Sequence, residues 1–108
     1  MAQTISVKPG DTASLEEAIA GAGDSGDLLL IDVRTPEEFR SGHIPTAINI
    51  DHRRIAEGAA EIDRDQRIVL YCRSGSRSRS AYRTLREMGF TDVVDFGGII
   101  HWKGEIER

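Results

Sequence analysis

The sequence predicts an α/β fold in which helices cover both faces of a parallel sheet. Short runs of β-branched and other apolar residues alternate along the chain with segments of helical periodicity. The run at residues 28–33 is apolar on both faces of a strand apart from Asp32, which is typical of a central parallel strand. Strands that alternate with helices of this length favour a parallel sheet.

The expected elements follow one another without a repeat, a linker or a low-complexity tract. Strands are expected at residues 3–7, 28–33, 47–50, 68–71 and 92–96. Helices are expected to begin at residues 14 and 35, and to span residues 53–61 and 78–88, with a short element at residues 99–103.

Two of the helix starts carry capping signals. In a capping box, a Ser or Thr hydroxyl accepts the N–H of the third helical residue, and a Glu at that residue reaches back. Ser14 with Glu17 fits this pattern, and so does Thr35 with Glu38, where a proline occupies the first helical position. Gly23 is placed to end the first helix.

Length and composition predict one domain spanning residues 1–108. The chain is 39% hydrophobic and 30% charged, which is typical of a globular protein. Its longest run of hydrophobic residues is five, at residues 68–72, whereas a membrane span needs about 20, so we expect no contact with a membrane. The first residues lack the basic and apolar regions of a secretory signal.

The cysteine and histidine content argues against a disulfide and a metal site. One cysteine cannot form an internal disulfide, and one cysteine with three scattered histidines makes a poor metal site. We therefore expect no metal and no cofactor, and a reducing cytoplasmic location. Nothing in the sequence indicates an oligomeric state.

Positive charge is concentrated in one segment. The net charge of the chain is −4, which argues against nucleic-acid binding. Residues 66–86 nevertheless contain six arginines and no acidic residue, so the remainder of the chain carries −10. Such a segment is either a local anion site or an arginine-rich, solvated helix face.

The chemistry is expected at Cys72, directly after the strand at residues 68–71. Ligands of an open parallel sheet bind at the carboxyl ends of its strands. The small residues Ser74, Gly75 and Ser76 let the backbone curl, so that its N–H groups and the following helix N-terminus form an anion site. The same groups, together with Arg73 and Arg77, lower a thiol pKa. These features indicate a reactive thiolate rather than a small buried apolar side chain.

Four segments, in order, resemble the rhodanese family of sulfurtransferases over nearly the whole chain. They are LIDVRTPEEF (residues 30–39), GHIPTAIN (residues 42–49), VLYCRSGSRS (residues 69–78), and the pair Gly97-Gly98 followed by Trp102. The resemblance implies a five-stranded parallel sheet flanked by helices. It also implies a thiosulfate sulfurtransferase in which Cys72 accepts a sulfane sulfur as a persulfide. One departure is Thr46, where the family commonly has glycine.

Carried over by position, Cys72 is the expected nucleophile of a persulfide reaction. The substrate-binding residues would be those of the following loop: Arg73, Ser74, Gly75, Ser76 and Arg77. The expected partners are a small anionic sulfur donor and a thiol, cyanide or protein acceptor. Arg73 is the expected donor anchor, because a guanidinium suits a tetrahedral oxyanion. Arg77 either shares that role or pairs with Asp32 or another acid at a strand end.

Two alternatives remain at this point. A cysteine phosphatase or arsenate reductase needs an arginine six positions after the cysteine, where this chain has Ser78, and a general acid that the sequence does not identify. A non-catalytic persulfide carrier or regulatory module would use the same chemistry at Cys72. In the preceding segment, Arg34 is expected to pair with Glu37 or Glu38.

Overall fold

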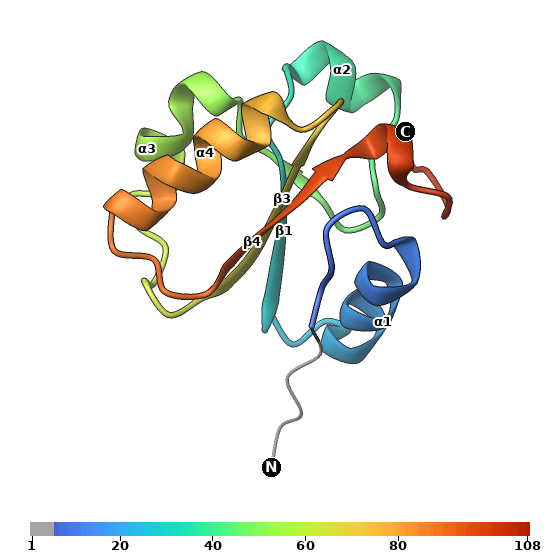
Figure 1. Cartoon of the computed structure of the whole chain (residues 1–108), viewed down its shortest axis with the longest axis horizontal. Helices are drawn as coiled ribbons and strands as arrows, with labels where there is room; N and C mark the ends of the chain where they lie inside the picture. Colours follow the sequence, from blue (N-terminus) through green and yellow to red (C-terminus); the bar gives the residue numbers. More distant parts are fainter. Residues whose placement is uncertain (1–5) are drawn as a thin grey trace.

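A computed structural model describes residues 6–108, which form a sheet of four parallel strands with helices on both faces (Figure 1). The strands lie side by side in the order β2-β1-β3-β4. Their bounds are β1 Leu28–Asp32, β2 Ile48–Asn49, β3 Arg67–Cys72 and β4 Val93–Gly98. The helical elements are α1 Thr12–Ala22, α2 Pro36–Ser41, η1 His52–Arg54, α3 Ile55–Gly58, α4 Ser76–Glu87 and η2 Ile99–His101.

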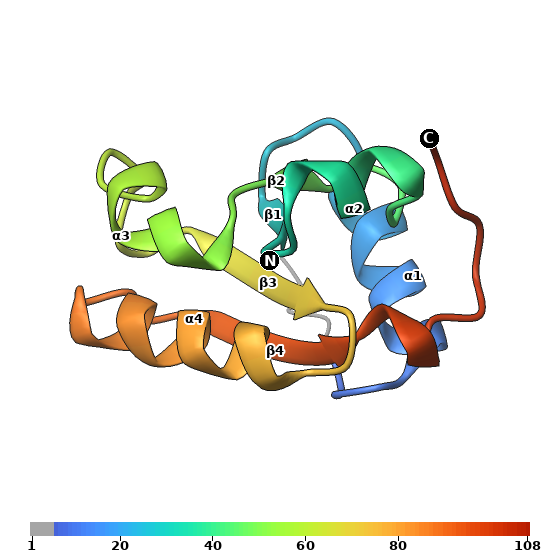
Figure 2. The ribbon, with the colours of Figure 1, turned by 90° about the horizontal axis from the view of Figure 1, so that it is seen from above.

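The sheet separates two apolar cores. Because successive side chains of a strand point to opposite faces, β3 sends Ile68 and Leu70 into one core and Val69 and Tyr71 into the other. Helices α3 and α4 cover the first core and α1 covers the second, as the two views show (Figures 1 and 2). The expected α/β class, the parallel sheet and its two covered faces are therefore confirmed.

The sheet of the described residues has four strands, where five were expected. Most of the expected strand at residues 3–7 lies outside the described residues. Ser6 and Val7 are not in a strand, although the chain reaches the free edge of β4 shortly afterwards, where the Gly10 N–H donates to the Phe96 carbonyl at 2.9 Å. No helix of the described residues is long and apolar enough to cross a membrane.

The capping box expected at Ser14 is wrong, whereas the one at Thr35 is confirmed. Asp11 caps α1 instead, because its carboxylate accepts the Ser14 N–H at 3.2 Å. The Ser14 hydroxyl is already used within the preceding turn, where it accepts the Lys8 N–H and donates to the Asp11 carbonyl, each at 2.9 Å. At α2, Thr35 and Glu38 make both bonds of the box.

Two other helices differ from their expected bounds. The helix expected at residues 53–61 is a 3₁₀ turn, η1, followed by the four-residue helix α3. Helix α4 begins at Ser76, two residues before the expected start, and so comes directly after the loop that follows Cys72. This earlier start brings the first turn of the helix next to the cysteine.

Thr46 adopts a backbone conformation that favours glycine. The Ala47 N–H donates to the Ile44 carbonyl at 3.1 Å, which closes a four-residue turn with Pro45 and Thr46 at its centre. Thr46 has a φ of 76°, and it is the one non-glycine residue with positive φ among residues 6–108. A turn with proline second and positive φ third is type II, whose third position normally takes glycine.

Candidate active site

Cys72 is the last residue of β3 and lies at the carboxyl edge of the sheet. Its side chain is buried, with 1% of its surface exposed. In the sheet register Cys72 is paired with Gly98 of β4, and the preceding Tyr71 is paired with Asp32 of β1. The parallel register thus brings the residues that follow β1 and β3 to the same edge, where ligands of open α/β sheets bind.

Two glycines let the chain curl around the sulfur atom. A Cβ atom on Gly98 would lie 2.5 Å from the Arg73 carbonyl oxygen and 2.8 Å from the Ser74 Cα, so only glycine allows the loop to pass over β4 there. Gly75 has a φ of 117°, a conformation that side chains disfavour, and it turns the chain into α4. The backbone path thus requires glycine at positions 75 and 98.

The loop and the first turn of α4 direct polar groups at the Cys72 sulfur. The Gly75 N–H donates to Sγ at 3.0 Å, and the buried Ser78 hydroxyl lies 3.5 Å from it. Burial raises the pKa of the Cys72 thiol, but hydrogen bonds from Ser78, Gly75 and Ser74 outweigh it, so the pKa lies below its ordinary value. The direction expected from the sequence is confirmed, with hydrogen bonds as the main lowering cause.

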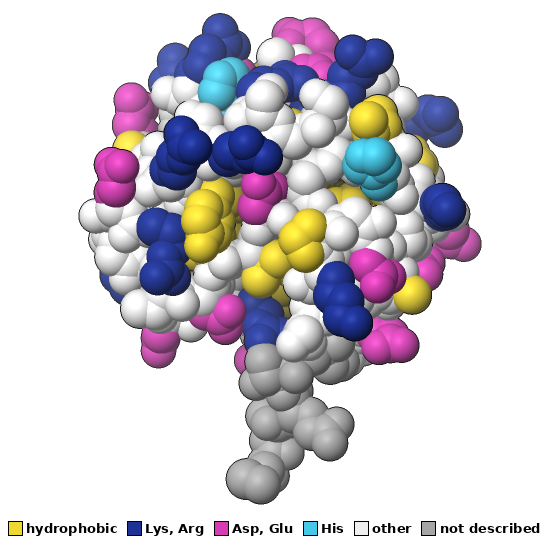
Figure 3. All heavy atoms as spheres, viewed as in Figure 1, with side chains coloured by type: hydrophobic (Ala, Val, Ile, Leu, Met, Phe, Trp, Pro, Cys, Tyr) yellow, Lys and Arg dark blue, Asp and Glu magenta, His cyan; other side chains and the backbone are white. Residues whose placement is uncertain are grey.

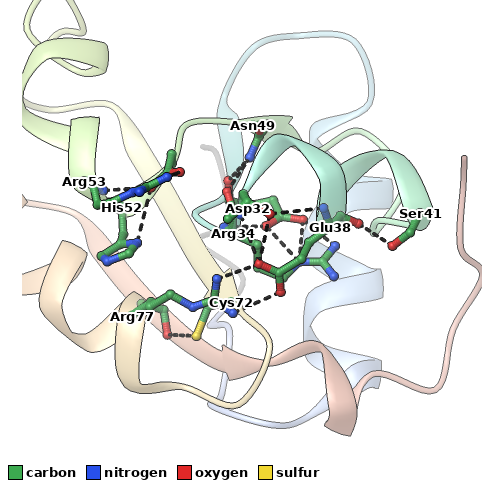
Figure 4. Close-up of polar contacts among 12 residues, drawn as sticks. Asp32, Arg34, Glu38, Ser41, Asn49, His52, Arg53, Cys72 and Arg77 are labelled. Carbon is green, nitrogen blue, oxygen red and sulfur yellow. Dashed lines mark hydrogen bonds and ion pairs between the residues drawn. The ribbon is translucent and has the colours of Figure 1, made fainter.

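Arg77 is paired with Glu38 and not with Asp32. Its two terminal nitrogens lie 2.7 and 3.0 Å from the two carboxylate oxygens of Glu38 (Figure 4). The hydrogen bond from Arg77 is the main reason why the pKa of Glu38 falls to about 2. Since Glu38 also caps α2, this ion pair ties α2 to the cysteine loop. A pair with an acid is thus observed, but that acid lies in α2 and not at a strand end as expected.

The pair expected between Arg34 and Glu37 or Glu38 is wrong. Arg34 instead folds back onto the Asp32 carboxylate, with its Nη2 at 2.7 Å from Oδ2, and both side chains are buried. Its Nη2 also donates to the Gly42 carbonyl at 2.6 Å. Burial of Asp32 at the end of β1 makes a close cation necessary, and Glu38 is already bound to Arg77.

The remaining residues of the predicted site have exposed side chains. Arg73, Ser74 and Ser76 are exposed, and within residues 6–108 Arg73 makes no hydrogen bond or ion pair through its side chain. Arg73 is therefore free to meet an anion that approaches from solvent. The described residues contain no group of three or more His, Cys, Asp or Glu side chains that could hold a metal ion.

Sequence reasoning missed two residues of this site as contributors. From the sequence, Ser78 was expected to begin a helix and to stand in the place of a phosphatase arginine, yet its hydroxyl lies 3.5 Å from Sγ. Glu38 was recognised as a helix cap, but its ion pair joins residues 39 positions apart. If the start of α4 had been predicted at Ser76, Ser78 would have been placed on the inward face of this helix. No local sequence pattern indicates the contact of Glu38.

Comparisons with known proteins agree with this geometry. The family model for the rhodanese-like domain matches residues 14–105. A sulfurtransferase of Allochromatium vinosum is 41% identical over 93 residues, covering 85% of this chain and 84% of its own. The thiosulfate sulfurtransferase GlpE of Pseudomonas syringae is 40% identical, covering 69% and 72%. The structure of an E. coli rhodanese with anions is similar with a TM-score of 0.68 at 31% identity, covering 75% and 98%.

Proposed function

The chain belongs to the rhodanese-like domain family, and on this premise we propose that it is a sulfurtransferase that uses Cys72 to move a sulfane sulfur from thiosulfate or a similar donor to a thiophilic acceptor. Relatives named as sulfurtransferases support sulfur transfer in general. Thiosulfate as donor, and cyanide, a thiol or a protein as acceptor, are part of the proposal. We take residues 1–108 as a single rhodanese-like domain.

The observation that carries the proposal is a buried thiol whose pKa is lowered by hydrogen bonds. The Gly75 N–H lies 3.0 Å from Sγ, and the thiolate is the nucleophilic form of a cysteine. A charged sulfur that is held by backbone N–H groups is stabilised without a counter-ion in contact. A persulfide anion has the same requirement, so the loop suits both states of the reaction.

The proposed reaction has two displacement steps. In the first, the Cys72 thiolate attacks the outer sulfur of thiosulfate; a bond forms between Sγ and that sulfur, and the sulfur–sulfur bond of the donor breaks with its electron pair leaving on sulfite. In the second, the acceptor attacks the outer sulfur of the Cys72 persulfide, and the electron pair returns to Sγ as the thiolate. No proton has to move between thiolate groups, so no histidine is needed.

We assign the loop residues separate roles in this reaction. The backbone N–H groups of Ser74, Gly75 and Ser76 are proposed to hold the bound sulfur and the donor. Arg73 is proposed to anchor the donor anion, because it is exposed, adjacent to the nucleophile and without a partner among the described residues. Arg77 is proposed to act on substrate only indirectly, by fixing the loop through Glu38.

Phosphatase or arsenate-reductase chemistry is less well supported. Ser78 occupies the position where a phosphatase has the arginine that binds the phosphate. Its hydroxyl is directed at Sγ and at the Gly75 and Gly97 carbonyls. Arg77, one residue earlier, is held by Glu38. Such an enzyme also needs a general acid that protonates the leaving group of the ester, and the sequence identifies none.

A persulfide carrier differs from an enzyme only in its acceptor. A carrier would load sulfur onto Cys72 and release it to one partner protein, whereas an enzyme would also turn over small acceptors. Both need a reduced thiol, so we propose a reducing compartment, the cytoplasm, for either. Turnover with cyanide distinguishes the two, because only a catalyst completes many cycles with it.

Mass spectrometry after incubation with thiosulfate tests the proposal. We expect the intact protein to gain the mass of one sulfur atom, and dithiothreitol to remove it. The Cys72→Ser variant is expected neither to gain mass nor to turn over thiosulfate with cyanide, because Cys72 is the only thiol of the chain. Sulfur transfer that survives in this variant would overturn the proposal.

The Arg73→Ala variant tests the proposed donor anchor. We expect it to raise the KM for thiosulfate several-fold with little change in kcat, because the guanidinium binds the donor before and during attack alike. An equal fall of kcat and kcat/KM would move Arg73 from donor binding to stabilisation of the transition state.

A further inference from the structure

Three arginines of the basic segment have exposed side chains without a partner in the described part of the chain. Among residues 6–108, the side chains of Arg73, Arg79 and Arg83 make no ion pair and no hydrogen bond, and all three are exposed. Other arginines of the same basic segment are bound: Arg77 by Glu38, and Arg86 by the Thr91 carbonyl. Within this segment, the unpaired arginines are therefore those of the cysteine loop and of the exposed side of α4.

Arg79 and Arg83 form one cationic face on the outer side of α4. Residues four positions apart lie one above the other on a helix, and Figure 3 shows Lys and Arg side chains along the surface over α4. Like charges in this spacing repel each other. The acidic residue one turn further, Glu87, is joined to Arg83 by no ion pair within the described residues. Neither arginine of this face is therefore neutralised by an ion pair within the described residues.

A groove connects this face with the cysteine loop. Its volume is about 630 Å³, and Arg79 and Tyr82 of α4 form one side of it. Ser74 and Gly75 line the same groove, and the Gly75 N–H is the group that contacts the Cys72 sulfur. The one carboxylate of the lining, Asp95, accepts the Gly97 N–H at 2.9 Å. An anionic partner on α4 would thus extend directly to the reactive loop.

We propose that the outer face of α4, through Arg79 and Arg83, docks an acidic protein that presents its own cysteine to Cys72 as the sulfur acceptor. This inference rests on the proposed function. The acceptor thiolate attacks the outer sulfur of the Cys72 persulfide; the new bond joins that sulfur to the acceptor, and the electron pair of the broken bond returns to Sγ.

The length and charge of the face favour a protein over smaller or other anions. At 1.5 Å per residue, Arg83 lies about 10 Å along the helix axis from Ser76, so a small thiol bound at Cys72 does not reach it. A nucleic acid would meet the −10 carried by the chain outside residues 66–86. A folded protein with an acidic surface patch can contact α4 while the rest of its surface stays away from the acidic residues outside residues 66–86.

Sulfur transfer to two synthetic peptides tests the proposal. One peptide carries a single cysteine flanked by four glutamates, and its control has glutamines in their place. With thiosulfate as donor and low ionic strength, we expect kcat/KM for the acidic peptide to exceed that for the neutral one at least about fivefold. The difference should vanish in the Arg79→Glu/Arg83→Glu variant and in about 0.5 M salt, where charges are screened.

A charge-matched variant controls for net charge. Arg40→Glu/Lys103→Glu changes the charge by the same amount with exposed residues outside α4, and it is expected to keep the preference for the acidic peptide. Turnover of thiosulfate with cyanide is expected to stay unchanged in both double variants. An equal rate with both peptides would overturn the proposal, and so would a preference that survives Arg79→Glu/Arg83→Glu.

Two further outcomes are informative. A single-stranded oligonucleotide that binds at physiological salt, and less so to Arg79→Glu/Arg83→Glu, would overturn the assignment in favour of a nucleic acid. If the wild type fails to turn over thiosulfate with cyanide, the proposed function fails, and docking is measured separately. A labelled, cysteine-free acidic peptide should then bind the wild type more tightly than the double variant by fluorescence anisotropy; equal binding would overturn the docking face as well.

Discussion

Cys72 is buried, and yet the pKa of its thiol lies below the ordinary value. Burial in a protein interior penalises a thiolate, so a buried cysteine is ordinarily inert. Here hydrogen bonds from Ser78, Gly75 and Ser74 outweigh that penalty, and the pKa of the thiol is lowered. Because these donors are part of the loop and of the first turn of α4, the pKa of the thiol depends on the conformation of residues 72–78.

Removal of the Ser78 hydroxyl is expected to raise the pKa of Cys72. In the wild type, the rate of alkylation by iodoacetamide should rise with pH to a midpoint below the value of about 8.5 of a free cysteine. In Ser78→Ala the midpoint should move upward, because burial remains while one donor is lost. Ser80→Ala, at an exposed position of α4, is the matched control. An unchanged midpoint in Ser78→Ala would contradict the role of this hydroxyl.

The ion pair between Arg77 and Glu38 is expected to stabilise the fold in a pH-dependent way. Glu38 has a folded-state pKa of about 2, below its ordinary value of about 4.3. Its contribution is therefore complete above the ordinary value and is lost as the pH falls through the folded one. Glu38→Gln should lower the free energy of unfolding at neutral pH by about 1–2 kcal/mol, because it removes a charged hydrogen bond that is partly exposed to solvent.

Urea titrations of the wild type and Glu38→Gln at several pH values measure this effect. The difference between the two proteins should shrink below the ordinary Glu pKa. Arg77→Ala should give a similar loss, and the double variant Glu38→Gln/Arg77→Ala less than the sum of the two. Strict additivity would show that the two side chains do not stabilise each other.

At the scale of elements, the site depends on how closely β4 approaches the cysteine loop. Gly98→Ala places a Cβ atom 2.5 Å from the Arg73 carbonyl oxygen, so the loop must move away from Cys72. We expect a folded variant, detected by circular dichroism, in which the alkylation midpoint rises and sulfur uptake from thiosulfate falls at least tenfold.

Gly89→Ala provides the control for the loop. Gly89 has a φ of 98° with open space around it, and it lies at the far end of α4. Its substitution should lower the stability by about 1–2 kcal/mol through backbone strain and leave the alkylation midpoint unchanged. A normal sulfur uptake in Gly98→Ala would show that the approach of β4 does not shape the site.

The turn before β2 carries strain that glycine would relieve. Thr46 has a φ of 76° in a type II turn, which costs a β-branched residue about 1–2 kcal/mol. Glycine loses more conformational freedom on folding, by roughly 0.5–1 kcal/mol. Thr46→Gly should therefore raise the free energy of unfolding by up to about 1 kcal/mol in urea, whereas Thr46→Val should not. A less stable Thr46→Gly variant would contradict the strain.

At the scale of the whole molecule, one sheet contributes side chains to both apolar cores. Leu30 and Leu70 are buried on opposite faces, the first under α1 and the second under α3 and α4. Leu30→Ala and Leu70→Ala should each lower the free energy of unfolding by about 2–5 kcal/mol. Ile48→Ala, at a position that is 41% exposed, should cost much less.

The same variants test whether the chain unfolds as one domain. Trp102 packs against the core under α1, so its fluorescence reports that face, and circular dichroism reports the helices of both. If residues 1–108 form one domain, fluorescence and circular dichroism should give the same unfolding midpoint in each variant, and this midpoint should be lower than that of the wild type. A transition in which only one signal shifts would divide the chain into two units.

The fold class followed from local patterns that the structure retains. Apolar runs on both faces predicted the central strands, since a strand covered on both sides has no polar face. The capping box at Thr35 and the glycine after α1 were correct because their bonds involve neighbours in the sequence. The cysteine loop was predicted for the same reason: its glycine and serines determine the local path of the backbone.

Contacts between distant segments were decided only by the tertiary structure. Glu38 and Arg77 are 39 residues apart and meet because β1 and β3 end at the same edge of the sheet. The choice of Asp11 over Ser14 as a cap depended on a turn that uses the Ser14 hydroxyl elsewhere. Side chains with several possible partners bind the one that the packing of the sheet and helices brings closest. The sequence determined the path of the cysteine loop, because its small residues act locally, and the tertiary structure determined which charged side chains lie around that loop.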